Sequence, residues 1–273
     1  MRRDFTDSQP AGHAGHAGHD YPRGKTMTSI LITGASKGIG RATAAELASR
    51  GHRVVATARN PRVLDGLDVD RRLQLDVTNQ ASVDAAIKQA GDVDVLVSNA
   101  GDIFSAAVEA SPLAEIERLY TLNTVGAIRV TQAVLPQMRA RRKGRLVYAS
   151  SVAGRTVRPG NAAYAATKWA LEAFGEALAL ELAGFGIGVC LAEPGPISSG
   201  ALDRMPFYEL PDDPYADVVS PSRAAAMTPE QVATVLADLV EMPEVPLRAP
   251  VGAVAETLIS ARNDAPYDKP FKR

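Results

Sequence analysis

The alternation of short apolar runs with longer helical patterns, which begins at Ser29, constrains the fold more than any other feature of the chain. This alternation is typical of β-α-β units, in which parallel strands are joined by helices that cross one face of the sheet. We therefore predict an α/β fold with a doubly wound parallel sheet. The predicted strands are residues 30–32, 54–56, 73–75, 95–97, 146–148 and 189–191, with a seventh at 247–251, and the predicted helices include 39–50, 80–90, 113–138 and 162–183.

The chain divides into a short polar tail and one long domain. Residues 1–26 contain three Ala-Gly-His units and almost no aliphatic side chains, so we expect a disordered, dispensable tail. Nothing resembling a linker interrupts residues 27–273, and the 46% of hydrophobic residues suffice for one substantial core. We predict a single domain in which about residues 196–226 form a lid over the site.

Composition narrows the class of protein and its partners. The 30 Lys and Arg residues nearly balance the 31 Asp and Glu residues, so we expect neither nucleic acid nor a membrane as a partner. No apolar run approaches the roughly 20 residues that cross a bilayer, and the first 26 residues lack the apolar stretch of a secretory signal. The one cysteine, Cys190, lies in an apolar run and is predicted to be buried. A cytoplasmic protein is expected.

The histidines and one basic cluster offer weaker signals. His13, His16 and His19 have no fixed frame, so no metal site is predicted. His52 is the remaining histidine and would be the required base of a Ser-His-Asp hydrolase, an alternative that a single candidate position supports poorly. We interpret the arginines and lysine of residues 139–145 as solvated cations, which the C-terminal end of a helix favours.

A glycine-rich loop follows the first predicted strand and opens the first predicted helix. It reads Thr-Gly-Ala-Ser-Lys-Gly-Ile-Gly over residues 33–40. Glycines allow a tight turn and close backbone approach, while the helix N-terminus offers free N–H groups and a positive dipole end to a pyrophosphate. Because the loop lies between a strand and a helix, it predicts a dinucleotide site.

The end of the second predicted strand indicates which dinucleotide binds. An NAD-binding unit usually carries an acidic residue about 20 positions beyond the glycine loop, but Ala58 and Arg59 stand there instead. Arg59 favours a 2′-phosphate through its charge and bidentate geometry, and Lys37 adds a second cation. We predict NADP(H).

Tyr164 and Lys168 form the candidate acid/base pair. They are four residues apart at the start of a predicted helix, so they lie on one face. A free tyrosine has a pKa of about 10, and a neighbouring ammonium together with a charged nicotinamide would lower it. Ser151 follows the strand at 146–148, where its hydroxyl can bond a substrate oxygen.

These motifs occur in one order, each after a strand, together with Asn99-Ala100-Gly101 and Pro194-Gly195. At this point the chain resembles the single-domain branch of the short-chain dehydrogenase/reductase family, densely over about residues 29–200. The resemblance implies a Rossmann fold and an oxidoreductase. Two departures are Ser98 where the family often has Asn, and Ser199 where it often has Thr.

The resemblance also implies the role of each site residue. Asn123 would lie at a bulge in the long helix and relay protons through water, and Pro194, Gly195 and Ile197 would lie beside the nicotinamide amide. The implied catalytic residues are Asn123, Ser151, Tyr164 and Lys168, and the implied cofactor-binding residues are Thr33, Gly34, Ser36, Lys37, Gly38, Ile39, Gly40, Arg59, Asp76, Val77, Asn99, Ala100, Gly101, Tyr164, Lys168, Pro194, Gly195 and Ile197.

Three functions remain open: an NADP(H)-dependent ketone/aldehyde reductase or alcohol dehydrogenase, a sugar-nucleotide epimerase or dehydratase, and a nucleotide sensor without turnover. The apolar and aromatic residues of 201–215, which Ile103 and Phe104 should face, predict an apolar, medium-sized carbonyl or secondary alcohol as substrate. The resemblance implies a homodimer or homotetramer through two long helices. The stripe of Leu171, Phe174, Leu178 and Leu182 is expected in the core or at that interface.

Overall fold

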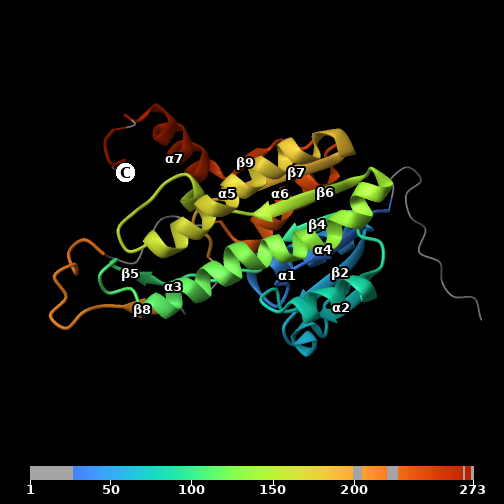
Figure 1. Ribbon diagram of the computed structural model, residues 1–273, viewed down its shortest axis with the longest axis horizontal. Coiled ribbons are helices and arrows are strands. Elements are labelled where there is room, and N and C mark those ends of the chain that lie inside the picture. Colours follow the sequence, from blue (N-terminus) through green and yellow to red (C-terminus); the bar gives the residue numbers. More distant parts are fainter. Residues whose placement is uncertain (1–26, 199–204, 220–226, 267, 272–273) are drawn as a thin grey trace, which may run out of the picture.

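Seven parallel strands form one sheet in the order β3-β2-β1-β4-β6-β7-β9 (Figure 1). The computed structural model describes residues 27–198, 205–219, 227–266 and 268–271. The doubly wound α/β fold is thus confirmed, and strand order reverses between β1 and β4, where such sheets place their ligands. The strands are β1 (Ser29–Ile32), β2 (Arg53–Ala58), β3 (Arg71–Gln74), β4 (Val95–Ser98), β6 (Gly144–Ala149), β7 (Ile187–Pro194) and β9 (Arg248–Val251).

Helices cover both faces of the sheet. Side chains of α1 and α6 pack on one face, and side chains of α2, α4 and α5 pack on the other. The helices are α1 (Gly38–Ser49), α2 (Gln80–Ala90), α3 (Leu113–Tyr120), α4 (Gly126–Arg141), α5 (Ala162–Leu182), α6 (Pro229–Glu241) and α7 (Ala253–Asp264), with short 3-10 turns at Pro61–Leu64, Val152–Gly154 and Ala183–Phe185.

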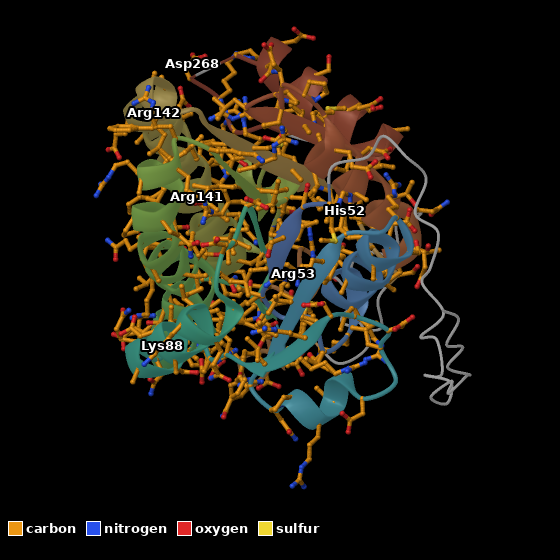
Figure 2. The ribbon with its side chains drawn as sticks, turned by 90° about the vertical axis from the view of Figure 1, so that its right-hand side faces the viewer. His52, Arg53, Lys88, Arg141, Arg142 and Asp268 are labelled. Carbon is orange, nitrogen blue, oxygen red and sulfur yellow. The ribbon has the colours of Figure 1, made fainter. Side chains whose placement is uncertain are left out.

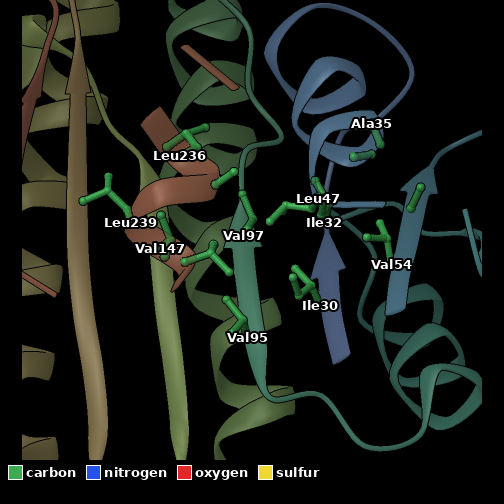
Figure 3. Close-up of a cluster of buried hydrophobic side chains, with 14 of the residues drawn as sticks. Ile30, Ile32, Ala35, Leu47, Val54, Val95, Val97, Val147, Leu236 and Leu239 are labelled. Carbon is green, nitrogen blue, oxygen red and sulfur yellow. The ribbon is translucent and has the colours of Figure 1, made fainter. Parts of the chain in front are cut away.

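The strands are apolar on both sides because both faces are covered. In β1, Ile30 and Ile32 pack under α1 and α6, whereas Leu31 between them packs under α2 and α4. Figure 3 shows the first of these clusters, in which Leu47 of α1 and Leu236 of α6 meet strand residues. Burial of this many aliphatic side chains supplies the main driving force for folding.

The helix predicted over residues 113–138 is interrupted. It comprises α3, a π-helical turn at Thr121–Val125, and α4. The extra residue of a π turn redirects its side chains, and Asn123 within the turn is buried against neighbouring segments. Periodicity alone did not indicate this interruption, whereas the family resemblance, which implies a helix bulge at Asn123, did.

The ends of the strands opposite the glycine loop are held by arginines (Figure 2). Arg141 donates to Asp92 Oδ1 at 2.8 Å and to the Val93 carbonyl at 2.7 Å, and Arg145 donates to the Leu239 carbonyl at 2.9 Å. The interpretation of residues 139–145 as solvated cations fits Arg141, which is exposed in the last turn of α4. It does not fit Arg145, which is partly buried on β6 and donates to carbonyl oxygens at the end of α6. None of the helices within the described ranges is long and apolar enough to cross a membrane.

Two predicted features fall wholly or partly outside the described residues. The tail, residues 1–26, lies outside them, and so do residues 199–204 and 220–226 of the predicted lid. Within residues 205–219, β8 (Phe207–Tyr208) pairs in parallel with β5 (Ser105–Ala106), which follows β4. This pairing joins the lid segment to the carboxyl edge of the sheet.

Candidate active site

The predicted site residues gather at the carboxyl ends of the central strands. Thr33 follows β1, Asn99 follows β4, and Ser151 follows β6. Because all these strands are parallel, their carboxyl ends share one edge of the sheet. His52 precedes β2 and therefore lies at the opposite edge (Figure 2), where its Nε2 is 3.0 Å from Glu241 Oε1. This separation excludes His52 as the base for Ser151.

Tyr164, Lys168 and Ser151 come together as the sequence predicted. The Ser151 side chain lies close enough to the Tyr164 hydroxyl to oppose the rise in the Tyr164 pKa. Lys168 Nζ lies 5.7 Å from the centre of the Tyr164 ring and donates to the Ala149 carbonyl at 2.7 Å. Ser151 is fixed in turn because its Oγ accepts a hydrogen bond from the Ala153 N–H at 3.1 Å. The Tyr164 hydroxyl and the Lys168 ammonium are thereby placed by α5, and the Ser151 hydroxyl by the 3-10 turn that follows β6.

The electrostatics of the pair differ from the sequence expectation in one respect. Burial raises the pKa of Tyr164, and the neighbouring Ser151 side chain only partly opposes this. Burial also lowers the pKa of Lys168 to about 8. The expected lowering of the Tyr164 pKa is therefore absent in the protein by itself, because the loss of hydration outweighs the effect of Ser151. The phenol is held in its protonated, donating form.

Asn123 lies next to this group, and both the oxygen and the nitrogen of its side-chain amide form hydrogen bonds. Its Oδ1 accepts from the Asp102 N–H at 2.9 Å, while its Nδ2 donates to the Asp102 carbonyl at 2.9 Å and to Thr167 Oγ1 at 3.1 Å. Thr167 immediately precedes Lys168 on α5. The side chain thus ties the segment after β4 to the helix that carries the acid/base pair; the implied proton relay stays a prediction.

The glycine loop is shaped so that only glycines fit. A Cβ on Gly40 would lie 2.4 Å from Asn99 Nδ2, and one on Gly34 would lie 2.8 Å from the Ala100 Cα. Gly34 and Gly38 also have positive φ values of 69° and 57°, which favour glycine. Thr33 Oγ1 accepts from the backbone N–H groups of Asn99 and Ala100 at 3.0 Å each, so the loops after β1 and β4 are locked together.

This cradle fits the pyrophosphate of a dinucleotide. Helix α1 begins directly after the loop, and its N-cap residue, Lys37, makes no side-chain hydrogen bond to the first turn. Free N–H groups at a helix N-terminus bind anions. Residues 33–40 would therefore hold the phosphates, and Gly101, which contacts Asn123, continues the surface toward the acid/base pair.

Arg59 occupies the position that was predicted to recognise a 2′-phosphate. Its exposed side chain follows β2 and makes no hydrogen bond to any residue of the described ranges. Burial opposes ionisation of Asp76, but two hydrogen bonds from Thr78 and the charges of Arg59 and Arg129 outweigh it and lower the Asp76 pKa. Arg59 is therefore a free cation with one acidic neighbour.

The remaining predicted cofactor residues lie along the same edge. Val77 is buried beneath Gly126, where a Cβ would come within 2.6 Å of its Cγ2. After β7, the Gly195 N–H donates to the Val251 carbonyl at 3.4 Å and Ile197 pairs with Met227. Ser199 lies outside the described residues.

Aromatic residues line the approach to Tyr164. Phe104 is buried and meets Tyr208 edge to face, with ring centres 5.5 Å apart. Both rings belong to a cluster that also contains Tyr164. Further along the lid segment, the Tyr215 hydroxyl donates to Glu109 Oε2 at 2.5 Å. The expectation that Phe104 faces residues 201–215 is met at Tyr208.

Sequence reasoning missed a buried charged cluster behind the acid/base pair. Glu172, one helical turn beyond Lys168, accepts hydrogen bonds from Ser150 and Arg248. Glu193, at the end of β7, is fully buried. A glutamate on the buried face of a helix, four residues after a candidate catalytic lysine, was the available signal.

The sequence profile of short chain dehydrogenases matches residues 28–206. The chain belongs to the short-chain dehydrogenase family. It is 34% identical to a 3-ketodihydrosphingosine reductase of Bacteroides thetaiotaomicron over 85% of this chain and 90% of that protein. It is likewise 34% identical to human retinol dehydrogenase 8, over 81% of this chain and 80% of that protein.

A solved short-chain dehydrogenase from Streptomyces avermitilis has the same fold. It superposes with a TM-score of 0.79 at 34% identity, covering 88% of this chain and 93% of that one. As a short-chain dehydrogenase, the protein is an oxidoreductase of CH–OH and carbonyl groups that uses a nicotinamide cofactor. The motif order that suggested this family is confirmed.

Proposed function

We propose that this short-chain dehydrogenase is an NADP(H)-dependent reductase of apolar, medium-sized ketones or aldehydes, which also oxidises the corresponding alcohols. The observation that carries the proposal is the grouping of Tyr164 with Ser151 and with Lys168, one turn beyond it, at the edge of the sheet that also carries the glycine loop. A tyrosine and a lysine four residues apart are common in helices and usually have only a structural role. Here both lie at the edge of the sheet where ligands bind.

Tyr164 supplies the proton of the reduction. The chemistry that NADPH supplies when bound is transfer of a hydride to the carbonyl carbon. As the carbon–oxygen π bond breaks, the oxygen takes the hydroxyl proton of Tyr164, and Ser151 donates a hydrogen bond to the developing alkoxide. Burial keeps Tyr164 protonated before the reaction, which suits the reductive direction.

The choice of NADP(H) rests on Arg59. It is a cation without a hydrogen-bond partner in the described ranges, and β2 itself ends in Thr57 and Ala58 without an acidic residue. A guanidinium binds a phosphate with two charge-assisted hydrogen bonds, whereas an unmodified ribose gains much less from it.

The apolar substrate class rests on the surroundings of Tyr164. Phe104, Leu119 and Tyr208 pack in one cluster with it. Two relatives are named for largely apolar substrates, a 3-ketosphingoid base and retinol. An apolar wall beside the proton donor would bury a hydrocarbon chain and exclude water from the reacting carbonyl.

The test is a cofactor-oxidation assay with a substrate panel. NADPH consumption is recorded with aliphatic and aromatic ketones and aldehydes of increasing size, and with charged and polyhydroxylated carbonyl compounds. We expect turnover to rise with apolar size. Turnover only with sugars contradicts the substrate class, and cofactor binding without turnover on any compound favours the nucleotide sensor.

We also propose a cytoplasmic homodimer or homotetramer assembled through α4 and α5. Leu180 and Phe174 of α5 are 77% and 44% exposed, more than the core-facing Leu171 and Leu178 of the same helix. Cys190 is a buried free thiol, which suits a reducing compartment. Light scattering that gives a monomer mass for wild type, or the same mass for wild type and Leu180→Glu, contradicts the assembly through α5.

A further inference from the structure

Glu172 is a buried carboxylate directly behind the acid/base pair. It lies on α5 four residues after Lys168 and is 4% exposed. Its Oε1 accepts from Ser150 Oγ at 2.5 Å, and its Oε2 accepts from Arg248 Nε at 2.9 Å. Ser150 directly precedes Ser151, so the carboxylate joins the end of β6 to α5 and to β9.

The packing around Glu172 leaves little space. A Cβ on Gly154 would lie 2.9 Å from the Glu172 Cγ and 3.2 Å from Ser150 Oγ. Gly154 ends the 3-10 turn that begins after Ser151. Glycine therefore lets this turn rest directly on the carboxylate side chain, and Glu172 is enclosed rather than open to solvent.

Charged groups face Glu172 from every element packed on it. Lys168 and Glu176 are on its own helix, and Arg248 is on β9. Arg155 follows the 3-10 turn. Glu193 lies near the end of β7, with the Cys190 thiol three residues before it on the same strand. Arg155 approaches Glu193 at 3.5 Å, and Arg248 also donates to Glu176 at 2.6 Å. The two arginines compensate the buried carboxylate, which would otherwise be costly.

Lys168 has no other carboxylate among its described partners. Among the described residues, its Nζ is satisfied by the neutral carbonyl of Ala149 and by the face of Tyr164. Burial lowers the pKa of Lys168, and the one charge that opposes this effect is Glu172. A buried ammonium needs a nearby negative charge to remain protonated.

We propose that Glu172 is a positioning residue that supplies the buried counter-charge to the Lys168 ammonium, while Arg248 holds its carboxylate in place. This inference rests on the proposed roles of Tyr164 and Lys168. Glu172 touches neither substrate nor cofactor and acts only through the lysine.

The test measures the charge of Lys168 directly. Protein labelled with ¹³C at the lysine Cε is titrated by NMR, and the Lys168 signal is assigned by its loss in Lys168→Arg. In Glu172→Gln the charge is lost but an oxygen acceptor for Ser150 remains, so a purely structural role would leave the titration unchanged. We expect the Lys168 pKa to fall by about one pH unit, and Glu172→Asp, which keeps the charge, to restore most of it.

Glu176→Gln is the matched control. Glu176 shares Arg248 with Glu172, but its side chain is 54% exposed and contacts neither Ser150 nor Lys168 in the described ranges. We expect the Lys168 titration of this variant to match wild type. An unchanged Lys168 pKa in Glu172→Gln, or an equal fall in Glu176→Gln, overturns the proposal.

Two further measurements complete the design. If Glu172→Gln does not fold, the double variant Glu172→Gln/Arg248→Gln is compared with Arg248→Gln alone, and equal Lys168 pKa values overturn the proposal. In the enzyme assay, the pH profile of kcat/KM should move toward lower pH in Glu172→Gln. If the NMR titration shifts but the pH profile of kcat/KM does not, ionisation of Lys168 and Tyr164 does not set the rate. The electrostatic coupling of Glu172 to Lys168 then stands, and the proposed role of Tyr164 and Lys168 in catalysis is contradicted.

Discussion

Lys168 and Tyr164 are stacked, with the ammonium nitrogen 5.7 Å from the ring centre and anchored to the carbonyl oxygen of Ala149. The ammonium therefore faces the ring and donates its hydrogen bond to the end of β6. The Tyr164 hydroxyl faces Ser151, which opposes the rise in its pKa, and it remains available to a substrate oxygen.

Tyr164→Phe should lower kcat by roughly 10²-fold or more, because it removes the proton donor to the developing alkoxide. Cofactor affinity should be unchanged, since the ring remains. The control is Tyr208→Phe, which keeps the edge-to-face contact with Phe104 and lies in the same cluster. Near-wild-type turnover of Tyr164→Phe would remove Tyr164 from its proposed role.

Wild type should prefer NADPH to NADH by roughly 10- to 150-fold in kcat/KM, which corresponds to about 1.5–3 kcal/mol for a charge-assisted contact. The double variant Ala58→Asp/Arg59→Gln should reduce or invert this preference. It removes the phosphate partner and adds a carboxylate that repels phosphate but accepts from ribose hydroxyls. Arg62→Gln, at an exposed arginine in the next turn, is the control. Equal preference in wild type contradicts the NADP(H) proposal.

Gly40→Ala should impair cofactor binding and destabilise the fold by about 1–3 kcal/mol, since overpacking displaces neighbouring groups. The added Cβ would lie 2.4 Å from Asn99 Nδ2 and 2.5 Å from the Gly34 carbonyl oxygen. Gly184→Ala provides the control because no atom lies within 4 Å of its Cβ position. Urea unfolding and cofactor titration of both variants are the measurements. Equal stability and equal cofactor affinity of the two variants would show that the glycine loop accommodates the added methyl group at residue 40 without strain.

Glu193 should make the protein less stable as pH rises. Burial, with the nearby charge of Glu172, raises the pKa of Glu193 from 4.5 to about 7. Between these values the folded protein binds more protons than the unfolded chain, so the stability that this group contributes is full below pH 4.5 and is lost as pH rises to about 7. The loss is at most about 3 kcal/mol.

Glu193→Gln tests this dependence because the amide cannot ionise. The free energy of unfolding of wild type and variant is measured in urea from pH 5 to pH 8. We expect the free energy of unfolding of the variant to rise relative to that of wild type as pH increases through this range. A difference between the two that stays constant with pH means that Glu193 is ionised in the folded protein throughout.

The strands and the glycine loop could be predicted because they depend on local pattern. Ile30, Leu31 and Ile32 form a continuous apolar run, and such a run between turn residues indicates a strand covered on both faces. Tyr164 and Lys168 could likewise be paired from their spacing, because helix geometry alone places residues four apart on one side.

The π turn at Asn123 and the pairing of β5 with β8 depend on contacts that no local pattern contains. Asn123 is held by Asp102 and by Thr167, which are 21 and 44 residues away. β5 and β8 are two residues each and gain stability only from each other and from the packing of Phe104 on Tyr208.

The sequence by itself therefore determined the order of strands and helices, the edge of the sheet that carries the site, and the residue types at its acid/base pair. Only the tertiary structure decided the charge environment of that pair. Glu172, Arg248 and Glu193 come from α5, β9 and β7. Burial in a shared interior lets the charge of Arg248 act on Glu172, and that of Glu172 act on Lys168 and Glu193, more strongly than in water. Burial is a property of the assembled fold, and so is the ionisation of every group within it.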